Sequence, residues 1–230
     1  MGLFALSDLH LSFFKEKPMD IFGDNWENHW QKIKDNWERT ISDNDTVIIA
    51  GDISWGCGLD EATPDLEFVN NLKGRKIILQ GNHDYWWNSV SKVRKAFPNM
   101  TFIKNDFTTY ENYAICGSRG WLCPNDISFT EYDEKLYNRE VIRVRLSLDS
   151  AVKSGYKDNI IIALHYPPMN EKREYSEFMK IIDEYNIKNV IYGHLHGKET
   201  LKNVLDGEYN GVRYNFTSAD YIDFCPVKIL

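Results

Sequence analysis

Short apolar runs followed at once by polar residues are the feature that most constrains this chain of 230 residues. The runs are rich in β-branched and aromatic residues and are too short for most helices, so they predict strands. Segments of helical period separate them, and buried strands that alternate with helices favour an α/β fold with covered sheets. The expected strands are 2–6, 46–50, 76–79, 113–116, 159–164, 190–192 and 209–216.

A long amphipathic helix is predicted over 24–41, where the first residue is an aspartate that can cap it. Its apolar face carries Trp26, Trp30 and Trp37, which we expect in the core because they recur at helical spacing without polar partners. His29 lies on the polar face of this helix and is expected in solvent.

Further helices follow from capping and periodicity. Thr63-Pro64 is expected to open one of them, and Thr130-x-x-Asp133 is a capping box that opens another. Turn signals near the end of the chain indicate an antiparallel portion, so the sheets should be mixed. The predicted helices are 63–74, 88–97, 130–155 and 174–185, and the turn signals are 206–207 and 210–211.

Length and composition fit one domain over residues 1–230, because 43% of the residues are hydrophobic and neither a repeat nor a flexible linker interrupts the pattern. The net charge of −7 argues against anionic membranes and long nucleic acids as partners. The four cysteines are irregularly spaced and form no C-x-x-C motif. The sequence shows neither an export signal nor an apolar run of membrane-spanning length. We therefore expect a cytoplasmic protein with reduced thiols.

The polar residues behind the apolar runs contain five of the six histidines of the chain. Because strand ends in an α/β sheet share one edge, where such folds place ligands, these residues are expected to converge. Their concentration at strand ends would be hard to explain for histidines scattered through a core or a surface. The signatures are Asp8-Leu9-His10, Gly51-Asp52, Gly81-Asn82-His83-Asp84, His165 and Gly193-His194-Leu195-His196.

Their spacing suits metal binding. Residues i and i+2 of an extended segment point the same way, so Asp8 and His10 can reach one ion together, as can His194 and His196. Oxygen and imidazole donors without thiolate favour Mn, Fe or Zn ions. The two carboxylate oxygens of Asp52 could bridge two ions about 3.5–4 Å apart, the separation common in two-metal hydrolases.

The ordered set of signatures, from residue 8 to residue 196, resembles that of the calcineurin-like metallophosphoesterase family. Each motif alone would be weak evidence, whereas all of them in order are specific. The resemblance implies two stacked mixed β-sheets flanked by helices, a four-layer sandwich. It also implies two metal sites, the first formed by Asp8, His10, Asp52 and His196 and the second by Asp52, Asn82, His165 and His194.

The resemblance further implies a hydrolase that cleaves a small-molecule phosphate ester through a metal-activated hydroxide. His83 would be catalytic, stabilising the developing charge or protonating the leaving oxygen, with Asp84 fixing its orientation. The phosphoprotein phosphatase branch carries Glu where this chain has Asp84, and an arginine soon after the motif of Asp52, where this chain continues Ile-Ser-Trp-Gly. Phosphoprotein substrates are therefore not expected.

Substrate contacts beyond these motifs are less constrained. Segment 117–133 has loop-like composition and is the main candidate for setting specificity; its Arg119 could bind phosphate, although a solvated arginine is favoured. Trp55 and Trp121 neighbour the metal motifs, as do Trp86 and Trp87, but core packing is favoured over substrate stacking.

Two alternatives remain open. A nuclease could use the same dinuclear centre, although the acidic charge balance disfavours long nucleic acids. A catalytically inactive scaffold could retain the fold, although loss of ligands or of His83 would then be expected, and this sequence keeps them all.

Overall fold

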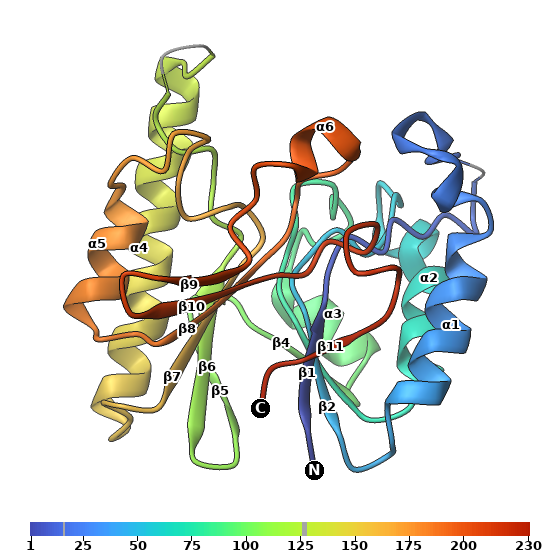
Figure 1. Cartoon of the computed structure of the whole chain (residues 1–230). Helices are drawn as coiled ribbons and strands as arrows, with labels where there is room; N and C mark the ends of the chain where they lie inside the picture. The colour runs from blue at the N-terminus through green and yellow to red at the C-terminus, as the bar shows by residue number, and fades with distance from the viewer. Residues whose placement is uncertain (16, 126–127) are drawn as a thin grey trace.

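The computed structural model describes residues 1–15, 17–125 and 128–230. Two sheets stack face to face, with helices outside each of them (Figure 1). The first sheet has the strand order β11 (Val227–Lys228), β1 (Leu3–Leu6), β2 (Thr46–Ile49), β3 (Arg75–Ile78) and β4 (Met100–Phe102). The second has the order β5 (Thr108–Tyr110), β6 (Tyr113–Ser118), β7 (Ile160–Leu164), β8 (Asn189–Tyr192), β10 (Val212–Phe216) and β9 (Gly207–Tyr209).

Both sheets are mixed. Their central strands pair in parallel, whereas β11, β5 and β9 pair antiparallel with β1, β6 and β10. The alternation of side chains along each strand explains the layering. In β1, Leu3 and Ala5 join the core between the two sheets, while Leu6 belongs to the core under the helices. The predicted α/β fold with two stacked mixed sheets flanked by helices is therefore confirmed.

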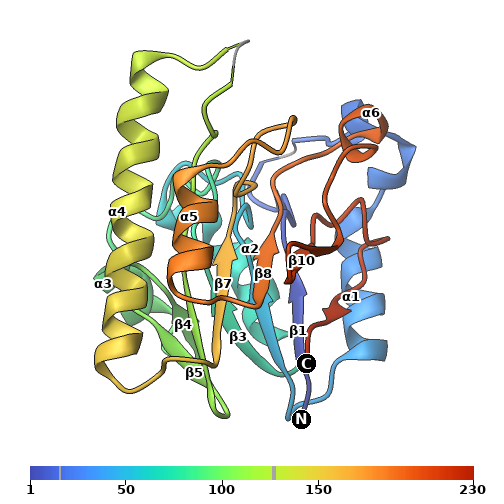
Figure 2. The same ribbon diagram turned by 60° about the vertical axis from the view of Figure 1, so that its left-hand side comes forward.

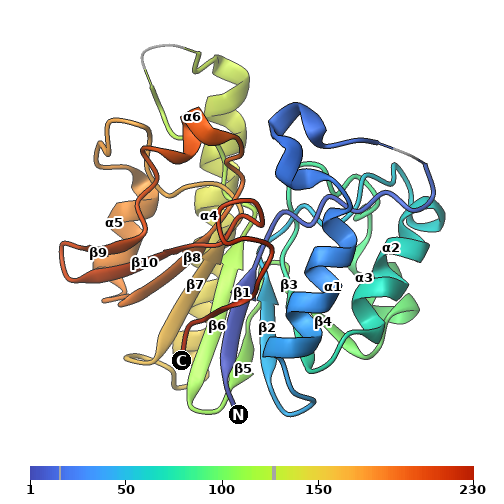
Figure 3. The ribbon, with the colours of Figure 1, turned by 45° about the vertical axis from the view of Figure 1, so that its right-hand side comes forward.

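Helices cover the outer faces of both sheets. On the first sheet lie α1 (His29–Thr40), α2 (Leu59–Asn71) and α3 (Val90–Ala96), which Figure 3 brings forward. On the second lie α4 (Glu131–Lys153) and α5 (Glu177–Glu184), as Figure 2 shows. The short α6 (Lys198–Leu201) lies above the carboxyl ends of the strands, as do the 3₁₀ turns η1 (Asp20–Phe22) and η2 (Asp24–Trp26). Among the described residues, no helix is long and apolar enough to cross a membrane.

The strand predictions hold to within a residue or two at each boundary. The last predicted run is a hairpin, in which β9 and β10 are joined at Asn210-Gly211, and Asn210 has a φ of 50°. The other turn signal was misplaced, because Gly207 already begins β9. Strands β4, β5 and β11 were not predicted, since each is too short to show a period of two.

The first helix starts later than predicted. Asn28 has a left-handed φ of 52°, which separates α1 from η2, so Asp24 lies in the 3₁₀ turn and caps nothing. Trp26 and Trp37 are buried as expected, but the Trp30 side chain is 37% exposed. The prediction for His29 was wrong as well, because its ring is buried and contacts the carbonyl oxygens of Trp26 and His10.

The second helix starts earlier than predicted. Helix α2 begins at Leu59, so Thr63 and Pro64 lie inside it. Acidic residues in its first turn, Asp60 and Glu61, favour this start because they complement the positive end of the helix dipole. The capping box of Thr130 and Asp133 is confirmed at the start of α4.

Candidate metal centre

All the signature residues follow strands at one edge of the two sheets. Asp8 follows β1, Asp52 follows β2, and Asn82 follows β3 in the first sheet. His165 follows β7, and His194 follows β8 in the second. The signature residues can therefore converge only if the carboxyl-end edges of the two sheets meet. A parallel bridge between Ser7 and Ser218 joins the end of β1 in the first sheet to the end of β10 in the second.

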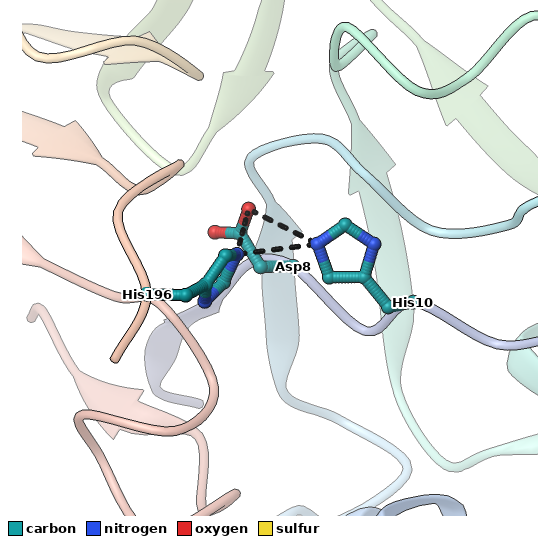
Figure 4. A group of neighbouring side chains, drawn as sticks. All are labelled: Asp8, His10 and His196. Atoms are coloured by element: carbon teal, nitrogen blue, oxygen red, sulfur yellow. Dashed lines mark hydrogen bonds and ion pairs between the residues drawn. The ribbon is translucent and has the colours of Figure 1, made fainter. Parts of the chain in front are cut away.

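One cluster consists of Asp8, His10 and His196, whose candidate ligand atoms all lie within 4.8 Å of one another (Figure 4). The Nε2 atoms of His10 and His196 are 3.2 Å apart, and His196 Nε2 is 3.3 Å from Asp8 Oδ1. Asp8 Oδ2 is held elsewhere, because it accepts hydrogen bonds from Ser218 Oγ and from the His194 backbone amide. Its Oδ1 is thus left facing the two histidines.

A second cluster consists of Asp52, His165 and His194, within the same 4.8 Å limit. His165 Nε2 lies 3.2 Å from His194 Nδ1 and 2.7 Å from Asn82 Oδ1. The amide oxygen of Asn82 therefore reaches the place where the second group of predicted ligands meets.

Asp52 lies between the two clusters. Its Oδ2 is 3.7 Å from His10 Nε2 and 3.4 Å from His165 Nε2, while its Oδ1 accepts a hydrogen bond from the His83 backbone amide. One carboxylate oxygen is therefore near histidines of both clusters, which is the arrangement that a bridging ligand requires.

The backbone is strained at four of the predicted ligands. Asp8, His10, Asp52 and His194 have φ values of 60°, 45°, 53° and 78°, in the left-handed region that non-glycine residues rarely adopt. Such strain gathers at functional sites, where the surroundings hold side chains in directions that relaxed strands would not give.

The glycines of two signatures make room for these carboxylates. A Cβ atom at Gly81 would collide with Asp52 Oδ1, and one at Gly193 would collide with Ser7 Oγ and Asp8 Oδ2. Both positions therefore need glycine because of close approach rather than flexibility.

Burial and charge act against each other in the clusters. Burial raises the pKa of Asp8 and Asp52, but the neighbouring histidines outweigh it and hold both well below the usual range. Burial lowers the pKa of His165, but the carboxylates of Asp52 and Asp8 and the Ala50 carbonyl together outweigh burial and raise it to about 9. At His196 the carboxylates of Asp8 and Asp220 likewise outweigh burial and raise the pKa to about 10. Before an ion binds, both histidines therefore hold a proton at neutral pH.

Two histidines are oriented by hydrogen bonds from the ring nitrogen that faces away from the cluster. His165 Nδ1 is 3.0 Å from the Ala50 carbonyl oxygen, so this nitrogen must donate and Nε2 is left to face the cluster. His196 Nδ1 is 2.9 Å from Asp220 Oδ1, and Asp220 Oδ2 accepts the Gly197 amide. Asp220 was missed from the sequence, although it follows β10 just as the signature residues follow their strands.

The Asp84 carboxylate was expected to orient the His83 ring, but its hydrogen bonds among the described residues go to other groups. Its Oδ2 accepts hydrogen bonds from the backbone amides of Asp52 and Gly81. Its Oδ1 accepts hydrogen bonds from the backbone amides of Ile53 and Ser54 and from the indole N–H of Trp86. Burial, with repulsion from Asp52, raises the pKa of Asp84 to about 6 against these donors. This buried carboxylate therefore joins the loop after β2 to the loop after β3.

The His83 side chain is oriented by rings. Its centroid is 4.3 Å from that of Trp55, which stacks on His10 at 4.8 Å. His83 Nδ1 is buried without a hydrogen-bond partner among the described residues. Lys17 Nζ lies 3.3 Å above the Trp55 ring. Trp55 is thus part of the site, whereas Trp86 and Trp87 are core residues as predicted.

Arg119 is not the solvated loop residue that was favoured. Its side chain is 16% exposed, 3.7 Å from buried Glu140 and 4.5 Å above the Trp121 ring. Its carbonyl oxygen accepts the backbone amides of His165 and Tyr166, which fixes the start of the loop after β7. Segment 117–133 therefore borders the site through its first residues, while residues 126 and 127 lie outside the described part of the chain.

The structure thus combines two stacked sheets with two neighbouring clusters of aspartate and histidine at one edge. The sequence model of the calcineurin-like phosphoesterase family matches residues 1–198. The chain therefore belongs to the calcineurin-like phosphoesterase family, as its motifs indicated.

Two known proteins resemble the chain in sequence. A probable cyclic nucleotide phosphodiesterase from Coxiella burnetii is 28% identical over 167 residues, which cover 69% of this chain and 62% of that protein. The gene 66 protein of Mycobacterium phage L5 is 32% identical over 78 residues, or 34% of this chain and 37% of that protein. The matches thus span less than two thirds of the length of either relative.

The fold also occurs in a solved structure of low sequence similarity. Phosphopantetheinyl hydrolase from Mycobacterium tuberculosis superposes with a TM-score of 0.63 at 14% identity, covering 100% of this chain and 95% of the other. At this identity the likeness shows a shared fold.

Proposed function

We propose that this chain, as one domain, is a two-metal hydrolase of small-molecule phosphate esters. The position of Asp52 carries the proposal, because its Oδ2 lies near histidines of both clusters. A carboxylate there can hold two ions close enough to act on one phosphate group. Family membership supports the same chemistry.

The clusters fit metal ions by three observations. Asp8 Oδ1 is buried and accepts no hydrogen bond among the described residues, and it faces His196 Nε2 at 3.3 Å, so it offers a charged oxygen to an ion in the first cluster. In each cluster two imidazole nitrogens face one another at 3.2 Å, a contact that a shared ion would explain. The donors are nitrogen and oxygen without thiolate, which favours Mn, Fe or Zn.

The ligand sets follow from the clusters and from the two neighbours that complete them. Asn82 is assigned to the second site because its Oδ1 lies 2.7 Å from His165 Nε2. The first ion would be held by Asp8, His10, Asp52 and His196, and the second by Asp52, Asn82, His165 and His194.

When bound, the ions would neutralise charge on the phosphate and lower the pKa of the water that attacks phosphorus. The chain itself supplies the positioning of the bridging carboxylate and a proton donor for the leaving oxygen. The His83 amide binds Asp52 Oδ1, so the backbone of the catalytic residue is tied to the bridging carboxylate. The His83 ring, fixed against Trp55, would donate to the leaving oxygen.

A diester is the favoured substrate. The printed name of the Coxiella relative, a probable cyclic nucleotide phosphodiesterase, supports this choice. The net charge of −7 disfavours the nuclease alternative, because long nucleic acids are held largely by clustered Lys and Arg. The positive centre formed by two ions would attract a small phosphate locally, in a cytoplasmic protein of acidic overall charge.

The test is hydrolysis of bis-p-nitrophenyl phosphate and p-nitrophenyl phosphate by metal-stripped protein reconstituted separately with Mn²⁺, Fe²⁺ and Zn²⁺. Two bound ions per chain and metal-dependent turnover are expected, with the diester cleaved faster. The matched control is His83→Ala, which should keep both ions and lose turnover. Two bound ions without turnover of either ester would favour the scaffold alternative, and a single bound ion would overturn the two-metal assignment.

A further inference from the structure

A cavity of about 360 Å³ adjoins the second cluster, between the loop after β7 and the segment that contains α6. Figure 1 shows both segments on the side of the carboxyl ends of the strands. Its volume lies within the usual range of small-molecule sites. Side chains from three separate segments give it an apolar wall, formed by Leu122, Cys123, Met169, Leu195, Val204 and Leu205.

Two buried polar side chains of the lining, Tyr192 and Asn170, already have partners in the protein, whereas Glu171, Arg173, Thr200 and Asn203, which also line the cavity, are exposed to solvent. The Tyr192 hydroxyl donates to the Leu205 carbonyl oxygen and accepts the Leu205 amide. The Asn170 side-chain amide donates to Pro124 and Glu174, and its oxygen accepts the Glu174 amide. The buried part of the cavity therefore suits an uncharged apolar group.

The cavity opens directly at the candidate metal centre. Tyr166 and His194 line it, and their ring centroids are 3.8 Å apart. A phosphate ester bound at His194 could therefore place one organic group in the cavity.

The cavity and His83 belong to different sides of the centre. Of the ring neighbours of His83, which are His10, Trp55 and Tyr85, His10 belongs to the first cluster and Trp55 stacks on it, whereas His194 belongs to the second cluster. In the proposed mechanism His83 faces the leaving oxygen, so the group in the cavity is the one that does not leave.

We propose that this cavity binds the apolar organic group that stays attached to phosphorus when a phosphodiester is cleaved. This inference rests on the proposed hydrolase function. Water supplies the oxygen of the new bond to phosphorus, and the bond between phosphorus and the leaving oxygen breaks. The leaving oxygen takes a proton from His83, and the proton that water loses restores His83. The cavity-bound group departs as part of a phosphomonoester. The substrate class is thus a phosphodiester in which the retained organic group is alkyl or aryl.

The first experiment uses methyl, butyl and hexyl p-nitrophenyl phosphates with the metal-loaded protein, so that the leaving group stays constant while the retained group grows. Each buried methylene is worth about 0.8 kcal/mol, so kcat/KM should rise up to about fourfold per methylene until the cavity is filled.

The variant Val204→Phe fills the cavity from a half-buried position and should remove this dependence on chain length. The matched control is Leu146→Phe on the outer face of α4, where the side chain is exposed. It should keep the full dependence.

A second measurement does not depend on turnover. With ¹³C-labelled methionine methyl groups, hexylphosphonate should shift the Met169 signal, whereas methylphosphonate should not. Met19 and Met100 serve as references, because they belong to the core under the helices of the first sheet.

The outcomes separate the two proposals. Rates that are flat with retained-chain length, together with an unmoved Met169 signal, would overturn the cavity assignment while the hydrolase proposal stands. A shifted Met169 signal without turnover of any diester would overturn the hydrolase proposal, and with it the claim that the bound group is retained during cleavage.

Discussion

Replacing Asp220 by asparagine should weaken one metal site and spare the other. Asp220 Oδ1 accepts a hydrogen bond from His196 Nδ1 at 2.9 Å, and both side chains are largely buried. This bond fixes the ring so that Nε2 faces Asp8, and the aspartate charge makes the ring a stronger donor to a cation. In the variant Asp220→Asn the shape is kept and the charge is lost.

The size of the effect follows from the type of bond. A hydrogen bond to a charged group contributes roughly 1.5–3 kcal/mol, and 1.4 kcal/mol corresponds to a factor of ten. The affinity of the first site should therefore fall by about 10–100-fold, in agreement with substitutions of other groups that hydrogen-bond to metal-bound histidines. The second site should change little, because its histidines are His165 and His194, and His165 Nδ1 is held by the Ala50 carbonyl oxygen.

The assay is a titration of metal-stripped protein with Zn²⁺ in competition with a chromophoric chelator, which resolves two dissociation constants. Asp223→Asn is the control, because Asp223 is exposed in the same loop and asparagine tolerates its φ of 50°. Unchanged affinity at both sites, or an equal loss at both, would refute the assignment of Asp220 to the first site.

Three further substitutions and one binding measurement test the centre. Asp52→Asn should weaken binding at both sites, and atomic absorption showing two tightly bound ions would contradict the bridge. His83→Ala should slow turnover by about 10²–10⁴-fold with metal content retained, so loss of an ion would make His83 a ligand. Asp84→Ala should lower the free energy of unfolding in urea by at least about 3 kcal/mol, because five buried N–H donors lose their acceptor. Metal binding at pH 7 should release at least two protons per chain, since the pKa values of His165 and His196 are raised to about 9 and about 10; calorimetry in buffers of different ionisation enthalpy measures the number, and binding without proton release would contradict the prediction.

The sequence predicted the layers and the convergence of the signature residues because both depend on local pattern. Strand length, side-chain alternation and the position of polar residues after strands are all readable along the chain. Asp8 and His10 were expected to act together because of their spacing, and the structure does place them in one cluster. The same argument was wrong for His194 and His196, which belong to different clusters.

The partners of these residues were not readable in the same way. The resemblance implied that Asp84 orients His83, yet its carboxylate accepts hydrogen bonds from the backbone amides of a loop 30 to 32 residues earlier, a pairing that only the fold creates. His29 was expected in solvent because of its place on a helical wheel, but its contact with the His10 carbonyl oxygen depends on the loop after β1. Asp220 could have been found by applying the rule of polar residues after strands to β10.

These long-range partners also explain how the strained backbone persists. Left-handed φ values at Asp8, His10, Asp52 and His194 cost of order 1–3 kcal/mol each. Hydrogen bonds to the Asp84 carboxylate hold the loop after β2, and the amide of His194 is held by Asp8 Oδ2. The carboxylates of the centre therefore have two separate tasks, since some of their oxygens fix the backbone while Asp8 Oδ1 and Asp52 Oδ2 face the histidines. Because ion binding would engage only the second group, the strained loops should keep their conformation when metal is removed, and the centre should be preorganised for it.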